Sequence, residues 1–380
     1  MIKEINKLFP LNGLFQHSVE LFGTPQFLIT TDSLIQRARL IKAAFQNNLC
    51  RTKIFYAYKA NDLPYICNKL HLEGLGAEVA SDLELNLAVK LGEKEIIFNS
   101  PGKTGKEIEL AIKNSVIIIV DNFEELELIK TIASNLKIQA LIGVRLSPPF
   151  LKDRTWSRFG IKPKLLSKFI RSARKEFVSF KGLHFHMGTE IETPCIYKKN
   201  IIYLKDILES ITDSDKKDIH FIDIGGGFGV GGYRKLNFLE AKFGFPLNLT
   251  GSISKNKPID YFAQEITTAF SNNILPLRGL SNTELWLEPG RWIIDPAVHL
   301  LTRALYTKEK DIILDANLFL CYRARYQIHP VFNISNFSFN KINQRLCGSL
   351  CRPDDIISKF YFGQKLKQGE VICLANLGAY

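Results

Sequence analysis

The sequence lacks the long apolar runs and the dense charge runs that would indicate a membrane or a nucleic acid. No stretch reaches the roughly 18 apolar residues that a bilayer-spanning helix needs, and the N-terminus, MIKEINKLFPLNG, has no apolar core of secretory type. The net charge is +12, but no run of five or more Lys and Arg residues occurs. Nucleic-acid-binding fingerprints are also missing. We therefore expect a cytoplasmic protein without membrane or nucleic-acid partners, whose basic balance reflects its surface or an anionic substrate.

A disulfide framework is also lacking. The chain has seven cysteines, an odd number, and most of them lie far from one another in the sequence. Such a pattern is typical of reduced thiols and agrees with a cytoplasmic location. No low-complexity segment or long linker divides the chain.

What is present is an alternation of short apolar segments and amphipathic stretches. The chain has 380 residues, which is too long for one ordinary core. We expect eight buried strands, at 54–58, 77–80, 96–98, 116–120, 140–146, 182–186, 221–224 and 284–288. Strands that alternate with helices in this way predict parallel strands with outer helices, and eight such units close a (βα)8 barrel.

The alternation of apolar and amphipathic segments ends near the end of the chain. The segments 292–306, 311–317, 321–332 and 371–374 are expected strands that have no long helical partners. We therefore predict an α/β protein with a (βα)8 barrel over 33–285 and a smaller β domain, a sandwich or barrel, made of 1–32 and 286–380.

Lys59 follows the first of the eight expected strands and precedes Asn61 and Asp62. A lysine at the end of a buried strand is held at the rim of a core, where desolvation or a cationic neighbour can make the amine nucleophilic. The same stretch also fits a strand-end lysine that points into water.

Two further segments carry unusual residues at strand ends. His184 and His186 share a face of their strand if alternation holds. We predict no metal site there, because no third ligand is evident nearby; one imidazole could instead stack on a flat ring, or be a satisfied buried histidine. The consecutive glycines Gly225, Gly226 and Gly227 would let backbone N–H groups converge on a phosphate, although a tight turn explains them too. Their spacing differs from the dinucleotide-binding fingerprint.

The last two motifs combine charges and thiols. Glu288 and Arg291 are separated by a Pro-Gly turn, and Arg291 could bind a phosphate or a carboxylate with two hydrogen bonds or form a structural salt bridge. Cys347 and Cys351 are not completed to a metal site by a second Cys or His pair. Because a cationic neighbour favours the thiolate, Cys351 beside Arg352 could act as an acid or base, unless it is simply a buried loop cysteine.

Together these motifs supply a lysine for a covalent bond to an aldehyde, a phosphate site, an imidazole for a ring face and a carboxylate for a pyridinium nitrogen. Pyridoxal 5'-phosphate needs that set of groups. The chain resembles the alanine-racemase-like, fold-type III decarboxylases, which include diaminopimelate decarboxylase and ornithine decarboxylase. The segments that carry the resemblance are FGTPQFLIT, FYAYKAND, GLGAEVASDLEL, NSPGKTGKEIELA, VRLSP, SRFGI, GLHFHMGTEI, IDIGGGFG, LEPGRW, CGSLCRPDD and LGAY.

The resemblance implies a role for each matching residue. Lys59 would bind the cofactor covalently, His186 would stack on its ring, and Glu288 would pair with its ring nitrogen. The phosphate would be held or approached by Thr189, Gly225, Gly226, Gly227, Arg291 and Tyr380. Cys351 would protonate the α-carbon after CO₂ leaves and would reach the site from the partner subunit of a homodimer.

The chain departs from the family where the substrate's far end is recognised. In diaminopimelate and ornithine decarboxylases an acidic residue follows the catalytic cysteine and meets a distal amino group, whereas here the residue is Arg352. The usual Arg-Pro-x-x-Tyr segment is altered as well, so either Arg323 or Arg325 could face the substrate. The substrate-binding residues that we predict are Arg291, Arg323, Arg325, Tyr326, Arg352 and Asp355.

A cation in place of an acid reverses the charge of the expected partner. We therefore predict a decarboxylase for an α-amino acid with an anionic distal group, such as the citrate-conjugated amino acids of the siderophore-assembly branch. The first alternative is a diaminopimelate or polyamine-pathway decarboxylase that tolerates Arg352. The second is a cofactor-binding regulatory protein without turnover.

Overall fold

The computed structural model describes residues 2–152, 157–231, 234–235, 256–325 and 327–380. These residues form two compact units. One consists of Ile35–Gly229 and Asn256–Ile293, and the other of the described parts of Met1–Leu34, Val230–Lys255 and Ile294–Tyr380. The domain boundaries expected from the sequence, 33–285 for the barrel and 1–32 with 286–380 for the β domain, stay a prediction.

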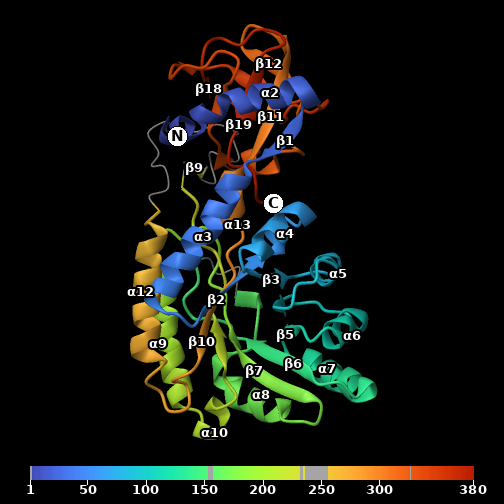
Figure 1. The fold of residues 1–380 in the computed structure, drawn as a ribbon, viewed down its shortest axis with the longest axis vertical. Helices are drawn as coiled ribbons and strands as arrows, with labels where there is room; N and C mark the ends of the chain where they lie inside the picture. Colours follow the sequence, from blue (N-terminus) through green and yellow to red (C-terminus); the bar gives the residue numbers. More distant parts are fainter. Residues whose placement is uncertain (1, 153–156, 232–233, 236–255, 326) are drawn as a thin grey trace. The chain divides into compact units, whose positions relative to one another are not determined.

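The first unit is a closed barrel of eight parallel strands, as predicted (Figure 1). In barrel order the strands are β2 (Thr52–Ala57), β3 (Gly76–Val79), β4 (Ile96–Phe98), β5 (Ile117–Val120), β6 (Ala140–Arg145), β7 (Val178–His184), β8 (Phe221–Asp223) and β10 (Glu284–Leu287). Each overlaps one of the eight segments expected from apolar runs. In this fold the carboxyl ends of all eight strands meet at one mouth, which is where catalytic groups gather.

Large apolar side chains fill the barrel interior, and glycines leave room for them. The rings of Phe221 and Trp286 stack with their centroids 3.7 Å apart and their planes 1° from parallel. A Cβ at Gly182 would lie 2.7 Å from the Phe221 ring, and one at Gly143 would lie 3.0 Å from it. Small residues on β6 and β7 therefore admit the aromatic layer, which is a packed core and not a pore.

The helices of this unit begin where the sequence supplies capping residues. Ser81 and Asn122 accept hydrogen bonds from the third residue of their helices, and Thr104 forms a reciprocal capping box with Glu107. The helices are α3 (Thr31–Asn48, mostly in this unit), α4 (Pro64–Leu72), α5 (Asp82–Lys90), α6 (Gly105–Lys113), α7 (Phe123–Leu136), α8 (Leu166–Ala173), α9 (Cys195–Glu209), α10 (Asp213–Lys216), α12 (Ile259–Asn273) and α13 (Arg291–Ile294). α9 and α12 pack side by side on the outside of the barrel (Figure 1).

The second unit is a curled mixed sheet. Its strands run in the order β15 (Lys341–Ile342), β18 (Tyr361–Phe362), β14 (Val331–Asn333), β19 (Val371–Leu374), β11 (Val298–Thr307), β12 (Asp311–Leu314), β16 (Arg345–Cys347) and β17 (Ile356–Ser358), and β1 (Gln26–Ile29) pairs with β11. Two helices add to its core: α1 (Ile2–Leu8) contributes Ile5 and Leu8, and α2 (Asn12–Phe22) contributes Phe15 and Val19. A further pair of short strands is β9 (Arg234–Lys235) with β13 (Gln327–Ile328).

Some expected strands of this unit are wrong in their extent. The segment 292–306 begins with the last residues of α13 and a 3-10 turn, and its strand starts only at Val298. The segment 321–332 is broken by a 3-10 turn, Tyr322–Arg325. Pro296 lies in the first of these turns and lacks the backbone N–H that a central strand needs, which gives the physical reason there. No helix in the described part of the chain is both long and apolar enough to cross a bilayer.

Candidate active site

Lys59 lies in a 3-10 turn, Tyr58–Ala60, that directly follows β2. Its ammonium forms an ion pair with Glu78, a fully buried carboxylate on β3. The turn is held from inside, because the hydroxyl of Tyr56 donates to the carbonyl oxygen of Asn61 at 3.0 Å. The side chain of Lys59 is 36% exposed, so its amine is anchored at the rim of the barrel rather than extended into water.

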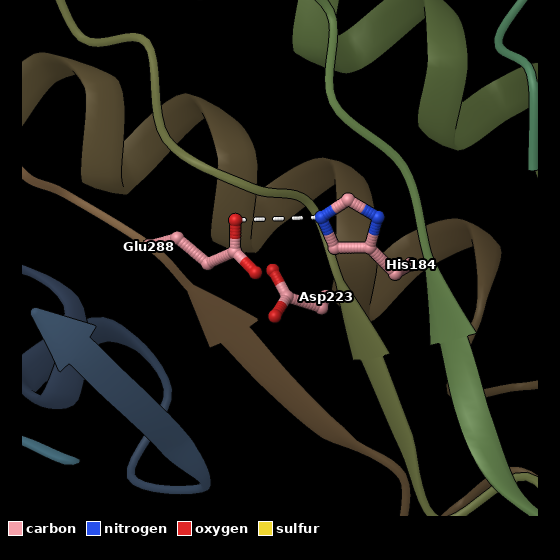
Figure 2. A group of neighbouring side chains, drawn as sticks. All are labelled: His184, Asp223 and Glu288. Atoms are coloured by element: carbon pink, nitrogen blue, oxygen red, sulfur yellow. Dashed lines mark hydrogen bonds and ion pairs between the residues drawn. The ribbon is translucent and has the colours of Figure 1, made fainter. Parts of the chain in front are cut away.

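A buried polar cluster lies at the ends of the neighbouring strands. Figure 2 shows His184 on β7, Asp223 on β8 and Glu288 just after β10, with their polar groups pointing toward one another. One ligand atom from each lies within 4.8 Å of the others, and His184 Nε2 is 3.4 Å from Glu288 Oε2. Asn99, just after β4, donates to Glu288 Oε1 at 3.2 Å and lies 3.0 Å from His184 Nε2.

The pKa values of the two carboxyl groups of this cluster are shifted in opposite directions. Burial raises the pKa of Asp223 well above its usual range, and the neighbouring Glu288 raises it further. Glu288 keeps a lowered pKa in spite of its burial, because His184 and Lys59 favour its charged form. Two carboxylates this close cannot both ionise in a dry site, so Asp223 holds the proton and Glu288 carries the charge. The charge therefore lies where a cationic group on a ligand would meet it.

The three glycines form the turn after β8, and their backbone positions are tightly enclosed. Gly225 and Gly227 have φ angles of +68° and +89°. A Cβ at Gly226 would lie 2.1 Å from the backbone oxygen of Glu288, and one at Gly227 would lie 2.1 Å from that of Gly188. Only glycine fits these positions, which allows a ligand to approach the backbone closely.

His186 and His184 lie close to different groups of the site. The N–H of Gly226 donates to His186 Nδ1 at 3.3 Å, so this imidazole is joined to the glycine turn. Burial and the nearby cations Arg145 and Lys59 together lower the pKa of His186 to about 3, with burial as the largest cause. The ring is therefore neutral at physiological pH, as a group that stacks on a flat ligand would be.

The remaining predicted residues of this unit are Arg291 and Thr189. Arg291, at the start of α13, forms an ion pair with the buried Glu190, which has a φ of +57°. Thr189 precedes Glu190 and is half-buried. The hydroxyl of Tyr197 on α9 donates to the carbonyl oxygen of Gly226 at 2.7 Å and so supports the turn from the helix layer.

The other predicted residues belong to the second unit. Cys351 is exposed in the loop between β16 and β17, and Arg352 beside it bonds both oxygens of Asp354. The buried carboxylate of Asp355 accepts the backbone N–H groups of Leu318 and Leu350, each at 2.8 Å. Asp355 therefore organises the loop, and its role toward a substrate stays a prediction.

Arg323 is buried and binds Asp295, the carbonyl oxygen of Ala379 and the side chain of Gln327. It therefore joins Ala379 to Asp295 in a 3-10 turn and to Gln327 on β13. Of the alternatives for the altered segment, Arg325 lies in the 3-10 turn without a described side chain, and Tyr326 lies outside the described residues. Tyr380 is 64% exposed.

Sequence reasoning missed several members of the barrel-mouth cluster. Glu78, Asn99, Asp223 and Glu190 were not predicted, although the first three follow the rule that polar residues at strand ends of a (βα)8 barrel face the mouth. His184, Asp223 and Glu288 together form a set of three possible metal ligands, which the sequence did not reveal. The cluster could therefore hold a divalent cation or a cationic ring nitrogen, and the prediction of no metal stays untested.

The residues present fit pyridoxal phosphate. Among the described residues, the buried atoms Glu78 Oε1 and His184 Nδ1 have no hydrogen-bond partner. Such orphaned polar atoms are costly unless a ligand or water satisfies them. A buried anion at Glu288, a glycine turn and a strand-end lysine match the ring nitrogen, phosphate and aldehyde of that cofactor.

Comparison with known proteins gives the same answer. Residues 31–295 match the family model described as pyridoxal-dependent decarboxylase, pyridoxal binding domain. A diaminopimelate decarboxylase of Helicobacter pylori is 30% identical, with 94% of this chain and 85% of that protein covered. An L-glutamyl-[BtrI acyl-carrier protein] decarboxylase of Niallia circulans is 26% identical, with 94% and 84% covered.

A solved structure shows that the likeness includes the fold. Diaminopimelate decarboxylase from Helicobacter pylori complexed with L-lysine superposes with a TM-score of 0.81 at 26% identity, covering 96% of this chain and 89% of that one. The predicted cofactor and carboxy-lyase activity are confirmed, and the alternative of a protein without turnover is set aside. The chain belongs to the fold-type III, pyridoxal-phosphate-dependent amino-acid decarboxylases.

Proposed function

We propose that this decarboxylase acts on an α-amino acid whose far end is anionic, such as a citrate-conjugated amino acid in siderophore biosynthesis. The observation that carries the proposal is Arg352, the residue that follows Cys351. Its guanidinium is half-exposed at the tip of a loop, so it can reach a ligand. A cation there attracts a carboxylate and repels a distal ammonium.

The cofactor would be held by groups at the barrel mouth. Lys59 would take its aldehyde, the N–H groups of Gly225–Gly227 and the hydroxyl of Thr189 would take its phosphate, and Glu288 would pair with its ring nitrogen. When bound, the pyridinium ring supplies the electron sink that accepts the bonding pair as the α-carboxylate leaves as CO₂.

Each protein group has a task that its environment supports. Glu288 stays ionised because of its lowered pKa and so keeps a proton on the ring nitrogen. The neutral imidazole of His186, joined to Gly226, is suited to cover the ring face. After loss of CO₂ the α-carbon needs a proton, and the thiol of Cys351 would supply it.

We propose that Cys351 reaches the site of a partner copy, which would make the enzyme a homodimer with shared sites. The exposure of Cys351 on its own chain supports this arrangement, since a catalytic thiol needs a covered site to act in. A cytoplasmic location also stays part of the proposal. Arg291, which is paired with Glu190, would contact phosphate or a substrate carboxylate, and the exposed Tyr380 would lie near the phosphate.

The test is a comparison of substrates with purified holoenzyme. We expect CO₂ release from a citryl-amino acid at a kcat/KM at least tenfold above that of free diaminopimelate, lysine or ornithine. A higher kcat/KM for any of the three free diamines would refute the substrate proposal.

The lysine is tested separately by Lys59→Ala. We expect loss of the visible absorbance band of the bound cofactor and of CO₂ release. Lys53→Ala is the matched control, because Lys53 lies on β2 with a similar exposure of 37% and an ion pair of its own, with Glu95. A Lys59→Ala protein that keeps both the band and the activity would remove the proposed role.

The second candidate is a diaminopimelate or ornithine decarboxylase. It is favoured by the names of the relatives, since the Helicobacter pylori proteins above are diaminopimelate decarboxylases. The Niallia circulans relative is different, because its name gives a glutamyl group attached to a carrier protein. The substrate comparison above separates the two candidates directly.

A further inference from the structure

The loop that carries Cys351 contains an ion pair between residues two positions apart. Arg352 Nε lies 3.0 Å from Asp354 Oδ1, and Arg352 Nη2 lies 2.8 Å from Asp354 Oδ2. This is the two-bond geometry with which a guanidinium recognises a carboxylate. Both side chains are partly exposed, 51% for Arg352 and 39% for Asp354, so a ligand can compete for the pair.

The loop has its own scaffold, which is separate from this pair. Asp355 accepts the N–H groups of Leu318 and Leu350, and its backbone oxygen accepts the N–H of Gly348 at 2.8 Å. A Cβ at Gly348 would lie 2.2 Å from Asp355 Oδ2, so the carboxylate occupies the space that a glycine leaves. Asp355 therefore supports the loop through contacts that do not use the guanidinium of Arg352.

A small cavity opens beside the pair. Its walls are the side chains of Leu318, Phe319, Tyr322 and Leu350, together with Arg352, Asp354 and Asp355. An apolar part of a ligand that binds Arg352 would therefore lie against these four side chains. All of these residues lie in the second compact unit.

We propose that Asp354 is an internal competitor. It occupies the two N–H donors of the Arg352 guanidinium, called here the fork of Arg352, until the substrate's distal carboxylate displaces it. This inference rests on the proposed function and names Asp354 as a specificity-determining residue of the same site. The exchange replaces one carboxylate by another on the same two N–H donors, so no charge is left unpaired at the guanidinium.

The competition favours one kind of ligand. The pair has no net charge, so it attracts ions weakly from a distance, and an anion gains fully only if it reproduces the two-bond geometry. A carboxylate does so, whereas a halide does not. A distal ammonium that approaches Asp354 is repelled by Arg352 beside it. The pair therefore selects against diamines as well.

The experiment compares four variants with the wild-type holoenzyme: Asp354→Asn, Arg352→Gln, the double variant, and Asp311→Asn. The last is the matched control, because Asp311 forms the same kind of exposed two-bond pair, with Arg345, in the same unit. Citrate is the probe, measured as a competitive inhibitor and by direct titration calorimetry. kcat and KM are measured for a citryl-amino acid and for diaminopimelate.

We expect Asp354→Asn to bind citrate roughly twofold to fivefold more tightly, the range that an exposed ion pair is worth. KM for the citryl substrate should fall by the same factor while kcat stays constant. Arg352→Gln should lose citrate binding, and the double variant should regain none of it. Asp311→Asn should match the wild type.

Three results would overturn the proposal. One is an unchanged or weaker affinity for citrate in Asp354→Asn together with a loss of citrate binding in Arg352→Gln. Asp354 would then not compete for Arg352, although the proposed function would still hold. Another is a gain in the double variant equal to that in Asp354→Asn. The third is a wild type that prefers diaminopimelate and loses that activity in Asp354→Asn, which makes Asp354 the partner of the ammonium and refutes the proposed function too.

Discussion

Histidine 299 is expected to make the protein sensitive to acid. It lies on β11, opposite Leu28 of β1, with no solvent exposure, and its ring centroid is 5.6 Å from that of Phe15. Neither ring nitrogen has a hydrogen-bond partner among the described residues. Burial in this apolar setting lowers the pKa of His299 to about 4, because a charged imidazole there would have neither water nor a counterion.

The size of the effect follows from proton linkage. Below about pH 6.5 the unfolded chain binds a proton at this residue that the folded protein binds only below about pH 4. The folded state therefore loses stability as the pH falls through this window, and at pH 5 the loss is about 2 kcal/mol relative to neutral pH. The sign is fixed by the direction of the shift, since the unfolded state binds more protons throughout the window.

The assay is urea unfolding of wild type and His299→Leu between pH 7.5 and pH 4.5, followed by circular dichroism. Differences between the two proteins cancel the titration of groups that they share. We expect the variant to gain about 2 kcal/mol relative to wild type between pH 7.5 and pH 5. Phe15→Leu is the control, because it disturbs the same contact without removing an imidazole and should cost stability equally at every pH.

Two outcomes would contradict this reasoning. If wild type and His299→Leu lose stability in parallel as the pH falls, His299 has a partner that neutralises its charge. If His299→Leu and Phe15→Leu show the same pH dependence, the change reflects packing and not titration.

Three more changes test the barrel mouth. Gly226→Ala would put a methyl group 2.1 Å from the backbone oxygen of Glu288, so the turn must move at a cost of about 1–3 kcal/mol. Titration with pyridoxal phosphate should show weaker binding, and an unchanged affinity would refute the tight turn. Glu288→Gln removes the buried charge and should lower kcat, measured as CO₂ release, by roughly 10²-fold. Full activity would mean that the ring nitrogen of the cofactor has another partner. Tyr58→Phe removes a 2.5 Å hydrogen bond to the half-buried His71 Nε2 and should cost about 1–3 kcal/mol in urea unfolding, because that nitrogen is left unsatisfied. An unchanged midpoint would show that water replaces the hydroxyl.

The sequence alone was informative where a local rule has one outcome. The apolar runs located all eight barrel strands, and residues such as Ser81, Thr104 and Asn122 begin helices because their side chains bond the first turn. In the second unit periodicity failed at 292–306, where a helical turn and Pro296 interrupt the expected strand.

The candidate site shows the same division. Lys59, the glycine turn and Glu288 could be named from the sequence, because a strand-end lysine, three adjacent glycines and a Glu-Pro-Gly-Arg segment are local patterns. Each pattern alone also fits a purely structural role, and the roles of these residues toward the cofactor stay a prediction. Their partners Glu78, Asn99 and Asp223 could not, because an isolated acid or amide at a strand end carries no signal until barrel closure brings distant strands together.

What the sequence by itself determined is therefore the class of protein: a (βα)8 barrel whose strand ends carry the groups that pyridoxal phosphate needs. Only the tertiary structure decided which of two buried carboxyl groups keeps its charge, and which carboxylate occupies the fork of Arg352. Both depend on distances of a few ångströms between side chains, in the first case from different strands, and ionisation in a buried site responds to such distances far more than to residue type.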